Sequence, residues 1–257
     1  MFFYDGNDIL KYIGTLFLFT SPLIFLSERF DFNFFQYGKF VGNNTSNIES
    51  KKGYPYFYIP ALVLLQIIYW GFCTYSRWGL SMYGLLTVHY SKRVYETLKV
   101  HKYSGNMSLK SLYLISSLYC LNTSLFGYIL YSRNGSDYTF SYFDYFIILC
   151  WRFSIIGNYM HHKHLAELRN DDNNNDKKNK TYMLPTKYLF KYVCCPHYLC
   201  EVIGWWLFAY LFQHFIGYVN AVFMTCYLCG RANRTLKWYK KKFDIGDNWN
   251  CIIPFIY

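Results

Sequence analysis

Positions 192–201 read YVCCPHYLCE and lead directly into an apolar run, 202–215, that has the composition of a membrane-spanning helix. Glu201 therefore lies in or at the mouth of a bilayer span, where an ionised side chain is costly and by default belongs to a functional site or a buried pair. In a helix that begins at Pro196, His197 and Tyr198 lie four and three positions before Glu201, so the three side chains share one face. The alternative is that the acid only stabilises the positive end of the helix.

The composition of the whole chain indicates a membrane protein. Of its 257 residues 53% are hydrophobic and 23% aromatic, which excludes an ordinary soluble domain. The formal net charge of +11 is best explained by cytosolic loops rich in Lys and Arg. We therefore interpret the positive charge mainly as a signal of membrane orientation and only secondarily as a sign of an anionic ligand. We expect no nucleic-acid partner.

Apolar runs near spanning length recur along the chain, so we expect an all-α integral membrane protein of about seven transmembrane helices in a single domain, 1–257. The first run should be a membrane helix and not a signal peptide, because residues 1–8 carry acids and no basic group that a signal peptide needs. Residues 28–53 are polar and predict a loop. Arg152 interrupts the fifth apolar run, and because a charge is costly in a membrane span, we expect its side chain to face the interior of the bundle. The expected spans are 9–27, 59–75, 80–90 with a helical continuation to Leu98, 112–131, 140–159, 202–215 and 217–228.

Two further patterns concern disorder and metals. Residues 170–180 consist of Asn, Asp and Lys and predict a solvated, disordered insert. Most of the nine cysteines are interpreted as small buried hydrophobes, and Cys194, Cys195, His197 and Cys200 do not have a usual zinc spacing. The stretch HHKH at 161–164 is a single histidine box, whereas membrane di-iron enzymes need several, so we expect no metal.

Three segments resemble the membrane reductases of the steroid 5α-reductase family, and within it they are most similar to the very-long-chain trans-2-enoyl-CoA reductases. HYSKR at 89–93 with ETLKVHKYS at 96–104 follows the pattern H-Y-x-K-R-x-x-E-T-L-x-V-H-R-F-S of that branch. The second segment runs from Gly157 to Arg169, and the third from LPTK at 184–187 through CPHY at 195–198 to IPF at 253–255. His197 stands where the family usually has Asn, which is more similar to the polyprenal reductase branch.

The resemblance implies a seven-helix bundle that encloses a cavity for NADPH and substrate. The bundle would lie in the endoplasmic reticulum membrane, with the active site and the C-terminus facing the cytosol. Residues 1–110 would supply the N-terminal helices and the basic loop, and 111–257 the cofactor-binding part. The cofactor positions of the family map onto Arg93, Asn158, His162, Arg169, Tyr182, His197, Glu201, Arg231 and Tyr239.

The implied reaction is the NADPH-dependent reduction of the 2,3 double bond of a trans-2-enoyl-CoA, the last step of very-long-chain fatty acid elongation, in a membrane shared with other elongation-cycle enzymes. Polyprenal or a steroid enone is the alternative substrate, and a non-enzymatic membrane protein is a further alternative. An enolate formed by hydride addition needs hydrogen-bond donors and a general acid. Tyr198 and Tyr90 are the candidate acids, Lys92 and Arg93 would lower the pKa of a neighbouring phenol, and the resemblance places Glu201 beside the nicotinamide. If Lys92 and Arg93 instead stabilise the enolate, Tyr90 is the stronger candidate. Spacing does not choose between the two tyrosines.

Overall fold

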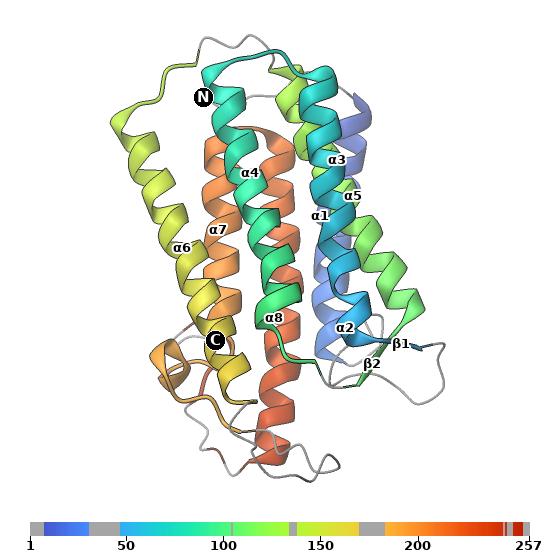
Figure 1. Cartoon of the computed structure of the whole chain (residues 1–257), viewed down its shortest axis with the longest axis vertical. Helices are drawn as coiled ribbons and strands as arrows, with labels where there is room; N and C mark the ends of the chain where they lie inside the picture. Colours follow the sequence, from blue (N-terminus) through green and yellow to red (C-terminus); the bar gives the residue numbers. More distant parts are fainter. Residues whose placement is uncertain are drawn as a thin grey trace.

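The computed structural model describes residues 8–30, 47–103, 105–133, 138–169, 183–243, 245 and 249–253. In these residues the chain is mostly helical, and the long helices lie side by side as a bundle (Figure 1). The predicted all-α architecture is confirmed. The predicted insert at 170–180 lies outside the described residues.

Seven long helices make up the described bundle, and short elements connect them at one end. The short elements are strands β1 (Asn47–Glu49) and β2 (Asn106–Ser108), which pair antiparallel with Ile48 opposite Met107, helix α2 (Ser50–Gly53), the π-helical turn η2 (Glu96–Val100) and the 3-10 turn η3 (Tyr188–Lys191). The long helices are α1 (Asp8–Arg29), α3 (Pro55–Phe72), α4 (Arg77–Tyr95), α5 (Leu109–Ser132), α6 (Tyr142–Glu167), α7 (Pro196–Phe212) and α8 (Phe215–Lys242).

Each predicted span overlaps one long helix, although most helices are longer than the apolar run that predicted them. Two helical segments, Ser50–Phe72 and Leu109–Ser132, are long and apolar enough to cross a membrane by themselves. The number of spans beyond these two stays a prediction. Helix α7 begins at Pro196, as the shared face of His197, Tyr198 and Glu201 requires.

Local interactions fix where several helices begin and end. Ser141 and Asp144 form a capping box at the start of α6: the Asp144 amide donates to Ser141 Oγ (3.2 Å) and the Ser141 amide donates to Asp144 Oδ2 (2.7 Å). Between α7 and α8 the chain reverses in two residues. Gln213 adopts a left-handed conformation (φ 50°), and His214 Nδ1 accepts a hydrogen bond from the Ile216 amide (3.2 Å).

Helix α4 does not end in a regular turn but widens into the π-helical turn η2. The His101 amide donates to the Glu96 carbonyl oxygen, five residues earlier, at 2.8 Å. Such widened turns are rare in proteins and are frequent at functional sites. The turn leaves the Glu96 side chain fully buried, with an exposed fraction of 0%.

Helix α1 packs closely along α8, and a buried ion pair joins them. A Cβ added at Gly230 of α8 would lie 2.9 Å from the Phe25 carbonyl oxygen of α1, so only glycine permits this approach. Beside it, Glu28 Oε2 accepts from Arg231 Nη1 at 3.2 Å and lies 3.6 Å from Arg234 Nη1. Glu28 is 1% exposed.

Two expectations about charged residues were therefore wrong. Glu28 belongs to α1 and not to a polar loop, because its partners lie more than 200 residues away and no local pattern reveals them. Arg152 is exposed and does not face the interior: the buried stripe of α6 runs through Trp151, Ser154 and Asn158, and position 152 lies beside that stripe.

We predict that Glu28→Gln destabilises the protein by roughly 3 kcal/mol, because removing one partner of a buried pair leaves two guanidinium groups without their carboxylate. The measurement is thermal or denaturant unfolding of the purified protein in detergent. Glu49→Gln is the matched control, since Glu49 pairs with Lys52 at 3.2 Å with both side chains more than 60% exposed. Equal stability of the two variants would contradict the prediction.

Candidate active site

A cavity of about 270 Å³ lies inside the bundle, and every long helix contributes to its wall. Most of its polar residues come from the ends of α3, α4, α6 and α7 that lie on the same side of the bundle as β1 and β2 (Figure 1). Its apolar residues come mostly from α1, α5 and α8. The polar lining includes Tyr58, Arg93, His101, Tyr119, His162, His197, Tyr198 and Glu201, and the apolar lining includes Ile13, Phe17, Leu118, Leu125, Val219, Phe223 and Met224.

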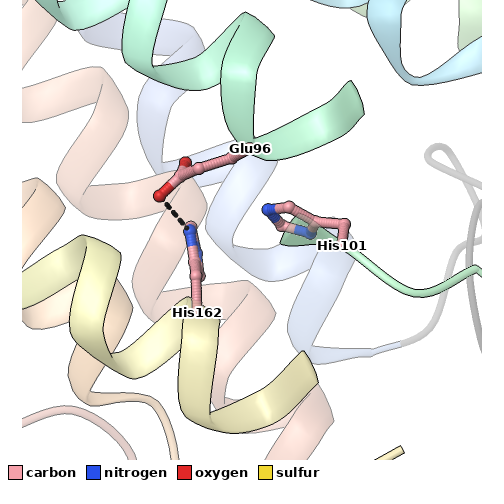
Figure 2. Close-up of side chains that lie close together, drawn as sticks. All are labelled: Glu96, His101 and His162. Carbon is pink, nitrogen blue, oxygen red and sulfur yellow. Dashed lines mark ion pairs between the residues drawn. The ribbon is translucent and has the colours of Figure 1, made fainter. Parts of the chain in front are cut away.

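A buried carboxylate organises the polar end. Glu96 Oε2 accepts a hydrogen bond from Arg93 Nη1 (3.0 Å), and Glu96 Oε1 lies 2.9 Å from Lys92 Nζ and 3.1 Å from His162 Nδ1. Figure 2 shows Glu96 and His162 pointing toward each other, with the His101 ring beside them. Burial by itself would raise the pKa of the Glu96 carboxyl, but His162 and the charges of Arg93 and Lys92 hold that pKa well below its usual range. Glu96 is therefore an anion that fixes the position of two cations beside the cavity.

His101 follows the π-helical turn and lines the cavity. Burial, together with the neighbouring His162 and Arg93, lowers the pKa of His101 to about 2. Its ring is therefore neutral at physiological pH, with one nitrogen able to accept and the other able to donate.

Glu96, His101 and His162 each offer one metal-ligating atom, and these atoms lie within 4.8 Å of one another (Figure 2). Such carboxylate and imidazole donors are usual for zinc or iron. Here Lys92 and Arg93 already contact the carboxylate and would repel a cation placed between the three groups. The cluster is better suited to hold Arg93 in position than to bind a divalent ion.

The structure brings many of the predicted site residues together. Arg93, His162, His197, Tyr198 and Glu201 all line the cavity. Behind them, Lys92 Nζ donates to Asn158 Oδ1, and Asn158 Nδ2 donates to the carbonyl oxygen of His197 (2.8 Å). This chain of hydrogen bonds connects α4, α6 and the first turn of α7.

Other predicted residues lie apart from this group. Tyr90 is fully buried against Asn122 and Thr123 of α5 and is not among the residues that line the cavity. Arg231 pairs with Glu28, and Arg169 donates to the Lys102 carbonyl oxygen at the exposed rim. Tyr239 packs in a second core cluster with Trp249, Cys194 and Cys195. Tyr182 lies outside the described residues.

Two tyrosines of the cavity wall, Tyr58 and Tyr119, were not predicted from the sequence. Arg93 Nη2 donates to Tyr58 Oη at 2.5 Å, and Tyr119 Oη lies 3.5 Å from Tyr58 Oη. Both phenols belong to apolar spans in which tyrosine is common, so their sequence context gives no signal of a site. Glu96 and His101 were part of the quoted motif at 89–104 but were not selected as site residues.

The polar end has unsatisfied capacity for a bound group. His101 Nε2 and His197 Nδ1 are buried without a hydrogen-bond partner, and both residues line the cavity at this end. A nicotinamide carboxamide both donates and accepts hydrogen bonds, so these atoms fit it. Lys99, Lys102 and Arg169 are exposed near the same end and fit the phosphates of a dinucleotide. The residues present therefore fit NADPH.

Comparison with known proteins identifies relatives. The family model described as 3-oxo-5-alpha-steroid 4-dehydrogenase matches residues 105–257, more than half of the chain. A very-long-chain enoyl-CoA reductase of Dictyostelium discoideum is 30% identical over 181 residues, which are 66% of this chain and 55% of that protein. The polyprenal reductase of Saccharomyces cerevisiae is 28% identical over 283 aligned positions, which cover 99% of both chains.

A third relative represents another substrate class. The bovine 3-oxo-5-alpha-steroid 4-dehydrogenase 1 is 36% identical over 76 residues, 29% of this chain and 30% of that protein. The chain spans about half the length of the enoyl-CoA reductases that it matches, at 55% and 56%. The similarity therefore extends over reductases with three kinds of lipid substrate.

Proposed function

This chain belongs to the 3-oxo-5-alpha-steroid 4-dehydrogenase family, and on that premise we propose that it is a membrane reductase that uses NADPH to saturate an activated carbon–carbon double bond. The observation that carries the proposal is the cavity, which has a polar end lined by Arg93, Glu201 and histidines and an apolar remainder. A lipid with an unsaturated carbonyl group has the same division into a polar head and an apolar tail. The direct test is NADPH oxidation by the purified protein with either a trans-2-enoyl-CoA or a polyprenal.

A trans-2-enoyl-CoA is the substrate that we favour. The segment at 89–104 follows the pattern of the enoyl-CoA branch, and the Dictyostelium relative carries that activity in its name. The exposed cations Lys99 and Lys102 lie near the polar end of the cavity and would be shared between the phosphates of coenzyme A and those of the cofactor. On this proposal the protein acts in the endoplasmic reticulum membrane, beside other enzymes of fatty acid elongation, with its site open to the cytosol.

Polyprenal is the second candidate, because two observations favour it. His197 stands where the family usually has Asn, and the yeast polyprenal reductase is similar along 99% of this chain. Polyprenal has no phosphate to pair with the cations at the rim. The two substrates therefore differ mainly in what they require outside the cavity.

NADPH, when bound, supplies the hydride that adds to the β-carbon of the substrate. The residues of the chain orient the reactants and handle the proton. Glu201 and His197 lie in the first turns of α7, whose position is fixed by the hydrogen bond from Asn158 to the His197 carbonyl oxygen. Tyr198, in the same turn and at the cavity, is the proposed acid that protonates the α-carbon.

We predict at least a tenfold preference for NADPH over NADH in kcat/KM. The additional phosphate of NADPH pairs with cations of the rim, and charge-assisted hydrogen bonds of this kind are strong. The measurement is initial rates with both cofactors over a range of concentrations. Equal kcat/KM values would contradict the assignment of the rim to the cofactor.

We predict that Glu201→Gln lowers kcat/KM more than tenfold. Glu201 faces a largely apolar cavity, where a charge persists only if it is paired or serves the bound reactants. Glu167→Gln is the matched control, because Glu167 is exposed at the end of α6 and lies 4.0 Å from Lys163. Thermal unfolding of both variants separates a loss of activity from a loss of fold. Normal kinetics in Glu201→Gln would mean that the acid only stabilises its helix.

We predict that Tyr198→Phe lowers turnover by roughly 100-fold with NADPH affinity unchanged, because the phenol of Tyr198 lines the cavity and its removal takes away the acid. Tyr90→Phe should cost less than about tenfold, since Tyr90 is buried outside the cavity lining. Turnover and cofactor binding are measured on both variants. The opposite order would assign the acid to Tyr90.

A further inference from the structure

Tyr58 occupies a distinctive position in the cavity wall. It lies near the N-terminal end of α3, 4% exposed, and its ring centre is 4.8 Å from the guanidinium carbon of Arg93. Its hydroxyl oxygen accepts from Arg93 Nη2 at 2.5 Å and from Tyr119 Oη at 3.5 Å. Three helices, α3, α4 and α5, thus meet at one phenol oxygen.

The hydrogen-bonding capacity of a phenol determines where the Tyr58 proton points. A hydroxyl has one hydrogen to donate and two lone pairs to accept with. Arg93 can only donate, and Tyr119 donates as well, so both lone pairs are occupied. Among the described residues no group accepts a hydrogen bond from Tyr58. Its hydrogen is left for an acceptor in the cavity that Tyr58 lines.

Arg93 makes this phenol a strong and preorganised donor. Hydrogen bonds in a chain polarise one another, so donation from a guanidinium to the phenol oxygen strengthens donation by the phenol. Arg93 is itself held by Glu96 Oε2 at 3.0 Å, so the cation does not need to move when charge develops nearby. Such fixed donors stabilise an oxyanion better than mobile water does.

Resting on the proposed reductase function, we propose that Tyr58 is a further catalytic residue, which donates its hydroxyl hydrogen to the carbonyl oxygen of the α,β-unsaturated substrate. When hydride adds to the β-carbon, the electron pair of the double bond moves toward this oxygen, and Tyr58 with Arg93 behind it stabilises the resulting enolate. Tyr58 keeps its proton throughout. The proton that completes the saturated product comes from the separate acid, Tyr198.

The first test is a vibrational measurement that needs no turnover. Wild-type protein is saturated with NADP⁺, which cannot supply hydride, and receives trans-2-hexadecenoyl-CoA with a carbon-13 label in its carbonyl. A parallel sample receives an equally labelled polyprenal. Infrared difference spectra should show a lower carbonyl stretching frequency on the protein than in detergent alone for the probe that the site takes. Calorimetry with the same probes measures whether each one binds.

The variants separate Tyr58 from its neighbours. Tyr58→Phe should abolish most of the frequency shift while NADP⁺ affinity stays the same, and it should lower kcat by about 100-fold to 1000-fold. Tyr113→Phe is the matched control: it removes the phenol of an α5 residue that is 69% exposed, and both the shift and kcat should stay the same. If Tyr58→Phe does not fold, fluorotyrosine at position 58 replaces it. The more acidic phenol should then enlarge the shift.

The outcomes distinguish the role of Tyr58 from the proposed reaction. A wild-type shift that survives in Tyr58→Phe, or that fluorotyrosine leaves unchanged, overturns the role of Tyr58 even if the protein reduces the probe. A shift that depends on Tyr58 in a protein that reduces neither probe supports the carbonyl contact and overturns the proposed reaction. Failure of the wild type to bind either probe overturns both.

Discussion

The ion pairs of Glu96 with Lys92, Arg93 and His162 determine the arrangement of the candidate site. A carboxylate this deeply buried is tolerated only with cationic and hydrogen-bonding partners around it. Once Glu96 is turned inward by the π-helical turn, Arg93 has a fixed direction, and Arg93 in turn reaches Tyr58 of α3. The charge of one side chain thus sets the geometry across α3, α4 and α6.

A second buried carboxylate, Glu28, holds two helices together instead of organising the polar end of the cavity. Glu28 joins α1 to α8 through Arg231 and Arg234, next to the close approach at Gly230. Residues of α1 and α8 form much of the apolar lining of the cavity. The first network therefore positions the reacting end of the site, and the second positions the wall against which a lipid tail would lie.

The sequence predicted what depends on local pattern. Apolar runs gave the helices, and Pro196 gave the start of α7 and so the shared face of His197, Tyr198 and Glu201. It could not give pairings between distant helices. Glu28 looked like the start of a loop because its partners are more than 200 positions away, and Tyr58 was not selected because Arg93 reaches it only in the folded bundle. Helical periodicity identifies a buried face, but it does not identify the group that meets that face.

The separation of a polar end from an apolar wall explains how one fold can serve substrates as different as an enoyl-CoA, a polyprenal and a steroid enone. All three present an oxygen conjugated to a double bond, and the polar residues at one end of the cavity would contact only that group. The rest of each molecule meets the apolar lining or the exposed cations at Lys99 and Lys102. Changes in that lining or at the rim would alter the substrate and leave the network around Glu96 and Arg93 intact. Substrate choice in this chain is therefore expected to depend on residues outside the network that its clearest sequence motif encodes.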